Sequence, residues 1–232
     1  GMSYSAKKPV VDRMLEALPG TLMLAGTALV FTLLYALPAG IISALNRNKW
    51  VDYLLRAASF VGVSMPTFWL GLVLIYIFGL KLGLVPIATS RVTPIGVILP
   101  AITLAVVVGS KYMRQVRLVI LEEMEKDYVI GARARGVSEM KILFGHILPN
   151  AVLPLITILG VLMGWLLGGV AVVEMVFSWP GLGNMAIYAI TMRDYPLIEG
   201  FVLWVSLAYM CINALVDASY ILLDPRLKRE RA

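Results

Sequence analysis

"ALPGTLMLAGTALVFTLLYALPAGIISALN" (residues 17–46) contains no charged side chain. A helix needs about 20 mainly apolar residues to cross the hydrocarbon core of a bilayer, so this run is long enough to span one. Lipid offers the backbone no hydrogen-bond partners, and a spanning segment must therefore be a helix or part of a closed barrel. The run lacks the alternation of apolar and polar residues that barrel strands show. The sequence therefore predicts a transmembrane helix here.

Four more apolar runs follow, at residues 57–80, 92–110, 147–173 and from about 200 to 223. The chain is 60% hydrophobic and 15% charged, whereas soluble domains are nearer half apolar and a quarter charged. The predicted fold class is all-α: a polytopic membrane protein with five spanning helices in this chain. Glycines 160, 164 and 168 recur every fourth residue, which predicts close packing of that helix against another one.

The distribution of basic residues predicts the orientation. Five spans place the two ends on opposite sides, and a chain that starts outside keeps most of its 20 Lys and Arg residues inside, as the positive-inside rule requires. The net charge of +6 is thereby explained without nucleic acid. We expect an external amphipathic lead-in (1–16), a transmembrane domain (17–223) in the cell membrane, a cytoplasmic insert (122–150) and a cytoplasmic tail (224–232). The lead-in lacks the apolar core of a cleavable signal peptide.

The insert "EEMEKDYVIGARARGVSEMKILFGHILPN" (122–150) is predicted to form two short helices. Acidic residues crowd its start, and Arg133 and Arg135 lie where the first helix should end, the charge order that a helix dipole favours. Gly136 can end that helix in a left-handed turn, Ser138 can cap the next one, and Pro149 should stop or kink it. The apolar residues of the insert would be covered either by the bilayer surface or by a partner protein.

"GARARGVSEMKILFGHILPNAVLP" (131–154) is similar to the cytoplasmic EAA loop of ATP-binding-cassette (ABC) importer permeases, specifically the dipeptide, oligopeptide and nickel group. Gly136, Leu148 and Pro149 fit the general pattern of this loop. Ile130, Gly131 and His146 depart from it. Further stretches resemble the same group along nearly the whole chain: "GVSMPTFWLG" (62–71), "VVEMVFSWPGLG" (172–183), "RDYPLIEG" (193–200), "NALVD" (213–217) and "LDPRLK" (223–228).

The resemblance implies a type I ABC importer transmembrane domain, with a further helix before Gly1 that would make six. It implies a non-catalytic permease subunit forming the path for peptides or for a nickel or metallophore complex. The implied partners are a second homologous permease, two ATP-binding subunits, an external solute-binding protein and membrane lipid. The insert would then be the coupling helix that contacts the ATPase, through Ala132, Arg133, Ala134, Arg135, Gly136, Val137, Ser138, His146, Leu148 and Pro149.

The translocation path or its gate is predicted at two kinds of position. Asp217 lies in an apolar run one turn after Asn213; an acidic residue in a membrane marks a pathway by default, although it could instead pair with a basic residue at the cytoplasmic end. Glu174 either lines the path or anchors the "SWPGLG" turn. The full set of candidates is Ser64, Met65, Thr67, Glu174, Trp179, Asn213 and Asp217.

Other functional classes leave different traces. The chain has no Gly-x-x-x-x-Gly-Lys-[Ser/Thr] phosphate loop, so ATP and Mg²⁺ are expected on partner subunits and no cofactor in this chain. One histidine and one cysteine, Cys211, are too few for a disulfide or a His/Cys metal site. A secondary transporter driven by an ion gradient could use Glu174 and Asp217, and an intramembrane enzyme would need a base beside a nucleophile at membrane depth. Both remain alternatives.

Overall fold

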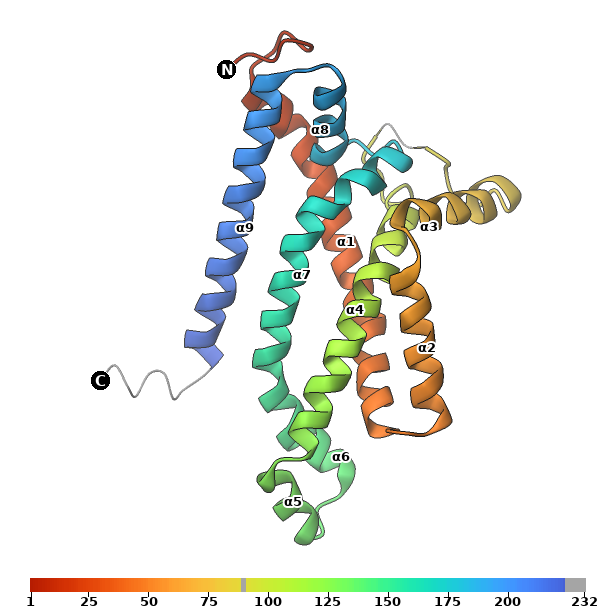
Figure 1. Ribbon diagram of the computed structural model, residues 1–232, viewed down its shortest axis with the longest axis vertical. Helices are drawn as coiled ribbons and strands as arrows, with labels where there is room; N and C mark the ends of the chain where they lie inside the picture. The colour runs from red at the N-terminus through yellow and green to blue at the C-terminus, as the bar shows by residue number, and fades with distance from the viewer. Residues whose placement is uncertain (89–90, 224–232) are drawn as a thin grey trace.

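The computed structural model describes residues 1–88 and 91–223, so the predicted tail 224–232 lies outside the described residues. Within those ranges the chain is helical and carries only an isolated bridge between Met2 and Pro9 in place of strands. Figure 1 shows an elongated bundle with the hairpin of α5 and α6 at one end and the N-terminus with α8 at the other. We call these the hairpin end and the opposite end.

The centre of the bundle is the pair α1 (Val10–Leu45) and α4 (Ile98–Met124). One face of α1 places a buried residue at every fourth position: Leu24, Ala28, Thr32, Ala36 and Gly40. Most of these are small, which allows the ridge of α1 to lie close against α4. At Gly40 a Cβ atom would lie 2.6 Å from the Cβ of Val116, so the two helices meet almost backbone to backbone.

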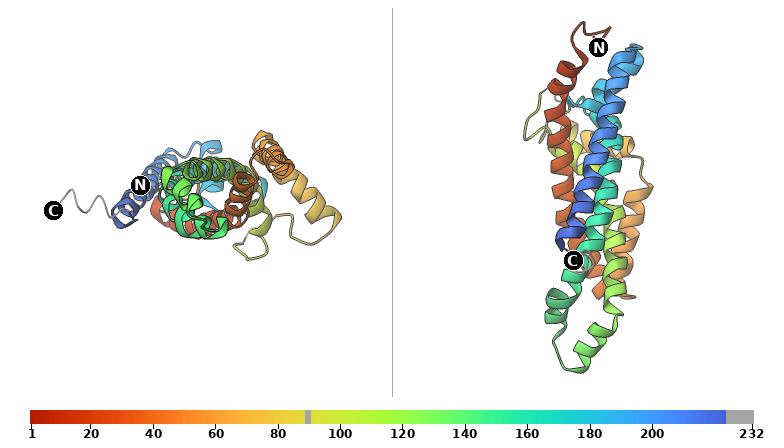
Figure 2. Two further views of the ribbon diagram at one scale, coloured as in Figure 1. Left: turned by 90° about the horizontal axis from the view of Figure 1, so that it is seen from below. Right: turned by 90° about the vertical axis from the view of Figure 1, so that its left-hand side faces the viewer.

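The predicted helix 57–80 is broken. α2 (Trp50–Ser64) ends before Pro66, and α3 (Thr67–Leu74) continues into a π-helical segment, Ile75–Lys81. The two parts meet at an angle of 100°, and Figures 1 and 2 show α3 projecting sideways from the bundle. Met65 takes an extended conformation (φ −75°, ψ 128°), because a residue before proline is driven out of the helical region.

The all-α polytopic class is confirmed, but the count of five spans is not. By length and composition, three helices in the described part of the chain could cross a membrane: Val10–Leu45, Glu139–Gly164 and Tyr195–Ser219. The bent pair 50–81 would be a fourth. The predicted span 92–110 corresponds to α4, which begins later and continues to Met124 through the basic residues Lys111, Arg114 and Arg117.

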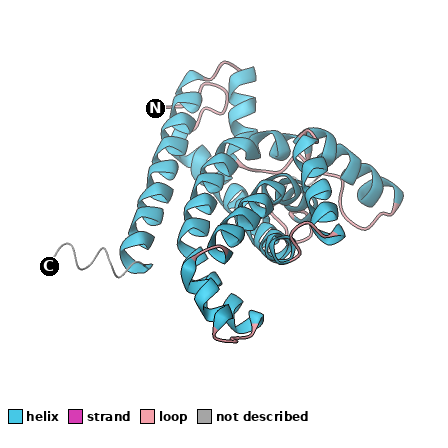
Figure 3. Ribbon diagram, turned by 60° about the horizontal axis from the view of Figure 1, so that its bottom comes forward, coloured by secondary structure: helices cyan, strands magenta, loops and turns pink. Residues whose placement is uncertain are grey.

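The second half of the chain adds α7 (Leu148–Val176), α8 (Leu182–Thr191) and α9 (Tyr195–Leu223) around this centre (Figure 1). Figure 3 shows that the described chain consists of helices joined by loops. The predicted glycine contact is confirmed, and its partner is α9. A Cβ at Gly160 would lie 2.2 Å from Val216 Cγ2, and one at Gly164 would lie 2.3 Å from the Tyr209 ring. The surroundings of Gly168 lie outside the described part.

Candidate functional site

The turn of the hairpin follows the local sequence. α5 (Asp127–Ala134) is capped by Arg135 and followed by Gly136, whose φ of +76° is left-handed, as predicted. The Gly136 N–H donates to the Arg133 carbonyl (2.9 Å) and the Val137 N–H to the Ala132 carbonyl (3.2 Å). These two bonds form a Schellman motif, which satisfies carbonyl groups left open at the helix end. The chain reverses there and enters α6 (Glu139–Ile142).

Three details of the hairpin differ from the prediction. Glu122 and Glu123 belong to the end of α4, and α5 begins only at Asp127. Ser138 occupies the N-cap position of α6 but makes no side-chain capping bond. Pro149 does not stop the helix: a π-helical turn, Leu143–Ile147, joins α6 directly to α7. Such a widened turn gives room for the proline ring, which would clash with a carbonyl group in a regular α-helix.

The two basic residues of the first helix differ in their contacts. Arg133 binds Glu139 with two hydrogen bonds, from Nε (2.7 Å) and Nη2 (3.0 Å), and so ties α5 to α6. The Glu139 carboxylate raises the pKa of the Arg133 guanidinium above its ordinary value. Arg135 is exposed and makes no ion pair within residues 1–88 and 91–223. Arg135 is therefore the more available of the two for a contact with another protein.

The hairpin has a buried and an exposed apolar set. Val129, Ala132, Ile142, Leu143 and Ile147 are buried and pack in the cluster that includes the end of α4. A second set, Ile130, Met140 and Phe144, points outward; Met140 and Phe144 are 63% and 62% exposed. We call these three the exposed hairpin residues.

The remaining predicted coupling residues line the same region. Ala134, Gly136 and Pro149 are exposed, and Val137, His146 and Leu148 are half-buried. The His146 carbonyl accepts a bond from the Asn150 amide at 2.7 Å. The structure therefore gathers the predicted coupling residues into one projecting unit.

The predicted path residues separate into three places. Glu174 and Trp179 are fully buried at the opposite end. Ser64, Met65 and Thr67 lie at the α2–α3 bend, where an open apolar groove of about 520 Å³ borders the first two. Asp217 is exposed and Asn213 half-buried on α9. The structure does not bring these groups together around one path within a single chain.

Glu174 binds two other elements. Thr21 of α1 donates to its Oε1 (2.7 Å), and the backbone N–H of Asn184 in the first turn of α8 donates to its Oε2 (2.9 Å). Trp179 donates its ring N–H to the Gly20 carbonyl at 2.8 Å. These bonds support the anchoring role for Glu174, and they join α1, α7 and α8 into what we call the α8 anchor. The sequence carried no sign that Thr21 and Gly20 take part.

The family model for binding-protein-dependent transport system inner membrane components matches residues 36–229. The chain belongs to this family. It is an ABC importer permease that lies in a membrane, and its predicted membership of the binding-protein-dependent group is confirmed.

Individual relatives agree with the family. The glutathione transport system permease protein GsiC of Escherichia coli (strain K12) is 38% identical over 228 residues, which are 98% of this chain and 74% of that protein. GsiC of Shigella boydii serotype 4 is 37% identical over the same share.

Solved structures of other ABC transporters share the fold of this permease. A chain of the MetNI methionine ABC transporter, in an inward-facing conformation, superposes with a TM-score of 0.77 at 19% identity, covering 91% of this chain and 96% of that one. A chain of an amino acid ABC transporter gives a TM-score of 0.66 at 18% identity, covering 90% and 92%. The predicted ABC importer fold is thereby confirmed.

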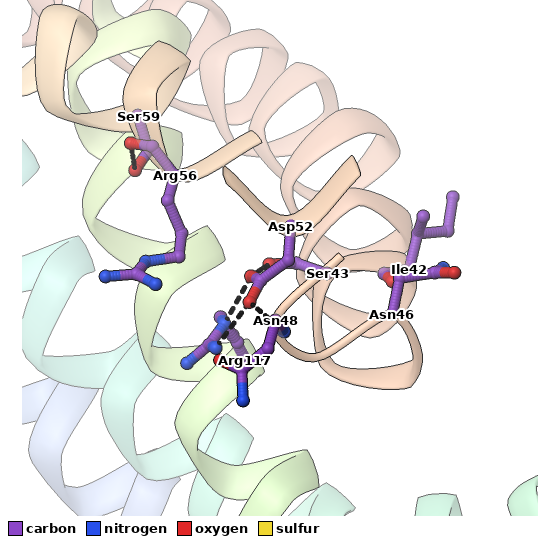
Figure 4. Close-up of polar contacts among 8 residues, drawn as sticks. All are labelled: Ile42, Ser43, Asn46, Asn48, Asp52, Arg56, Ser59 and Arg117. Carbon is purple, nitrogen blue, oxygen red and sulfur yellow. Dashed lines mark hydrogen bonds and ion pairs between the residues drawn. The ribbon is translucent and has the colours of Figure 1, made fainter. Parts of the chain in front are cut away.

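The permease also contains a buried ion pair that the sequence did not reveal. Asp52 and Arg117 lie 65 positions apart and bind each other at the hairpin end (Figure 4). In the sequence, both belong to charged segments flanking apolar runs, where charge is expected without a specific partner. In the described residues, no group of three or more His, Cys, Asp or Glu side chains could hold a metal ion.

Proposed function

We propose that this permease transports a short peptide inward and that its hairpin docks on an ATP-hydrolysing partner. A complete importer would combine it with a second homologous permease, two ATP-binding subunits and an external solute-binding protein. ATP and Mg²⁺ would bind to the partner subunits. The hairpin end would face the cytoplasm, as the distribution of basic residues favours.

The observation that carries this proposal is the set of exposed hairpin residues. Ile130, Met140 and Phe144 are large apolar side chains exposed on a unit that projects beyond the bundle (Figure 1). Apolar groups gathered at a projecting tip are typical of a docking surface. The bidentate Arg133–Glu139 pair and the Gly136 turn fix the orientation of α5 relative to α6. A partner that binds the exposed hairpin residues would therefore move both short helices together.

A peptide is the solute class that we favour. GsiC is named for glutathione, which is itself a small peptide, and the resemblance in sequence is to permeases for peptides and nickel. The part of the chain that the structure describes offers no cluster of metal ligands, but a nickel complex could travel without them. Uptake of radiolabelled glutathione, dipeptides and a nickel complex by the assembled importer would distinguish these solutes.

Crosslinking tests the docking of the hairpin. The native cysteine is removed by Cys211→Ser, and Met140→Cys is introduced in the assembled importer. We expect a thiol-to-amine crosslinker to join Met140→Cys to an ATP-binding subunit. The matched control is Tyr188→Cys, at an exposed position on α8 at the opposite end, which should give no such product.

Energy dependence tests the mode of transport. Uptake should stop when ATP is depleted and should persist when the ion gradient is collapsed. Loss of uptake only with the gradient would instead identify a secondary transporter. Absence of the Met140→Cys crosslink in an active importer would refute the docking role of the hairpin.

A further inference from the structure

A buried carboxylate joins three segments at the hairpin end. Asp52, in the first turn of α2, is fully buried and accepts four hydrogen bonds. Its Oδ1 binds Ser43 Oγ of α1 (2.6 Å) and Arg117 Nε of α4 (2.8 Å). Its Oδ2 binds the Asn48 N–H (3.1 Å) and Arg117 Nη2 (2.8 Å). We call these four residues the clamp.

The clamp fixes the short connection between α1 and α2, residues 46–49, which we call the elbow. Figure 4 shows Asp52 and Asn48 of this region facing Arg117 on α4. Asn48 itself is left-handed (φ +62°), a conformation that its hydrogen bond to Asp52 helps to hold. Two parallel bonds from one guanidinium group define both the distance and the angle between α2 and α4.

A second link lies farther along α4. Arg47 of the elbow pairs with Glu125, the C-cap residue of α4, at 2.6 Å. Arg117 and Glu125 are eight residues apart with no glycine or proline between them, about 12 Å of continuous helix. The elbow is thus held to the last two turns of α4, immediately before the chain enters the hairpin.

The chemistry of the clamp points to positioning. A buried ion pair stabilises a fold little more than apolar residues of the same volume would, because both charges lose their hydration. Its main physical effect is therefore to fix the relative positions of the two helices. We infer that the Asp52–Arg117 clamp makes the elbow and the hairpin end of α4 move as one body, so that movement of the hairpin reaches α1 and α2 as well as α7. This inference rests on the proposed docking of the hairpin, and it makes Asp52 a positioning residue for coupling.

A covalent link tests the common movement. In the Cys211→Ser background, Arg47→Cys and Glu125→Cys replace the exposed pair, and a bifunctional thiol reagent of matching length joins them. If the elbow and α4 move together, crosslinked importers should take up solute at the same rate as the same variant before crosslinking. Loss of uptake on crosslinking would overturn the inference, because it would mean that the two segments must separate.

Breaking the clamp tests its role in coupling. Asp52→Asn should lower the solute transported per ATP hydrolysed by about fivefold or more, the low end of typical coupling energies between sites. Joining Arg47→Cys to Glu125→Cys in the same chain should restore that ratio, since the covalent link replaces the clamp. Lys49→Gln, which removes a charge from an exposed position of the same elbow, is the matched control and should couple normally.

The outcomes separate the two hypotheses. The Asp52→Asn variant should still crosslink to the ATP-binding subunit through Met140→Cys, because the hairpin itself is unchanged. Normal coupling in Asp52→Asn, or failure of the covalent link to restore it in correctly inserted protein, would contradict the role of the clamp. Absence of ATP-driven uptake in the Cys211→Ser parent would instead contradict the proposed function.

Discussion

Gly136 is the residue at which the direction of the hairpin is decided. Its left-handed φ of +76° is needed for the two Schellman bonds, and a Cβ atom at this position would meet no heavy atom within 4 Å. Any penalty for a side chain here is therefore conformational and does not come from crowding. Strain of this kind costs about 1–2 kcal/mol for an ordinary L-residue.

Gly136→Val should uncouple ATP hydrolysis from uptake while leaving membrane insertion intact. A β-branched side chain strongly disfavours the left-handed region, so the turn should open and misplace Met140 and Phe144. Gly136→Asn is the matched control, because asparagine tolerates this region and should retain most activity. Both are measured as solute uptake per ATP hydrolysed in proteoliposomes, and full coupling in Gly136→Val would contradict the role of the turn.

At the scale of elements, the lead-in is held to the start of α9 by Asp194. Ser3 Oγ (2.6 Å), the Ser5 N–H (2.9 Å) and Ser5 Oγ (2.8 Å) all donate to its Oδ2. Burial alone would raise the pKa of Asp194, but these hydrogen bonds outweigh it and hold the pKa well below its ordinary value. A lowered pKa means that the carboxylate stabilises the folded lead-in above the ordinary pKa, and that this stabilisation is lost as the pH falls through the lowered value.

The lead-in should therefore stay attached at neutral pH and detach only well below about pH 4, the ordinary pKa of an aspartate. A fluorophore on Met2→Cys in the Cys211→Ser background would report detachment as a fall in anisotropy. Asp194→Asn should give the low anisotropy at every pH. Asp12→Asn, at an exposed acidic position nearby on α1, should show the same dependence of anisotropy on pH as the parent. A fall in the anisotropy of the parent near pH 6 would contradict the role of Asp194.

The contact of α7 with α9 gives a second prediction for elements. Gly160→Ala would place a methyl group 2.2 Å from Val216 Cγ2, and overpacking of this kind costs about 1–3 kcal/mol. Combining it with Val216→Ala should restore most of the lost thermal stability, measured in detergent. Gly26→Ala, where a Cβ meets nothing within 4 Å, is the control and should not destabilise the protein. Equal melting temperatures for Gly160→Ala and the parent would show that the two helices do not pack here.

The limits of sequence-based prediction also lie at this scale. The Gly136 turn could be predicted because its hydrogen bonds join residues at most five positions apart. The effects of the prolines could not be predicted in this way. At Pro66 the predicted span divides into two helices that meet at 100°, whereas Pro19, Pro38 and Pro154 lie inside continuous helices. A missing backbone bond is compensated by neighbouring groups in some packed helices and not in others, and this depends on tertiary contacts that a local pattern does not contain.

At the scale of the whole molecule, the features that the sequence could not predict are hydrogen bonds between residues far apart in the chain. Glu174 and Thr21 are 153 positions apart, and Asp52 and Arg117 are 65 apart. Each partner alone reads as a polar residue near the end of an apolar run. Family resemblance predicted the fold and the coupling hairpin, but the α8 anchor and the clamp required the packed structure.

Orientation is the prediction that belongs to the whole molecule. In right-side-out vesicles with the Cys211→Ser background, a membrane-impermeant thiol reagent should label Tyr188→Cys directly. Met140→Cys should be labelled only after the vesicles are opened, because the basic hairpin end is expected inside. Both side chains are more than half exposed in the described structure, so a difference in labelling between the two cysteines would report the side of the membrane on which each one lies. The reverse pattern would place the hairpin outside and exclude ATP-driven coupling through it.

The junctions on the two sides of the hairpin are not equivalent. On one side, Glu125 and the extended Lys126 interrupt the backbone between α4 and α5. On the other, helical residues continue without a gap from Glu139 through Pro149 to Val176. Met140 and Glu174 are 34 positions apart on this stretch, about 50 Å measured along the helix, so it connects the exposed hairpin residues to the α8 anchor. If the hairpin docks as proposed, its movement would reach α7 through an unbroken helix, and it would reach α4 and the clamp only across the break at Glu125 and Lys126.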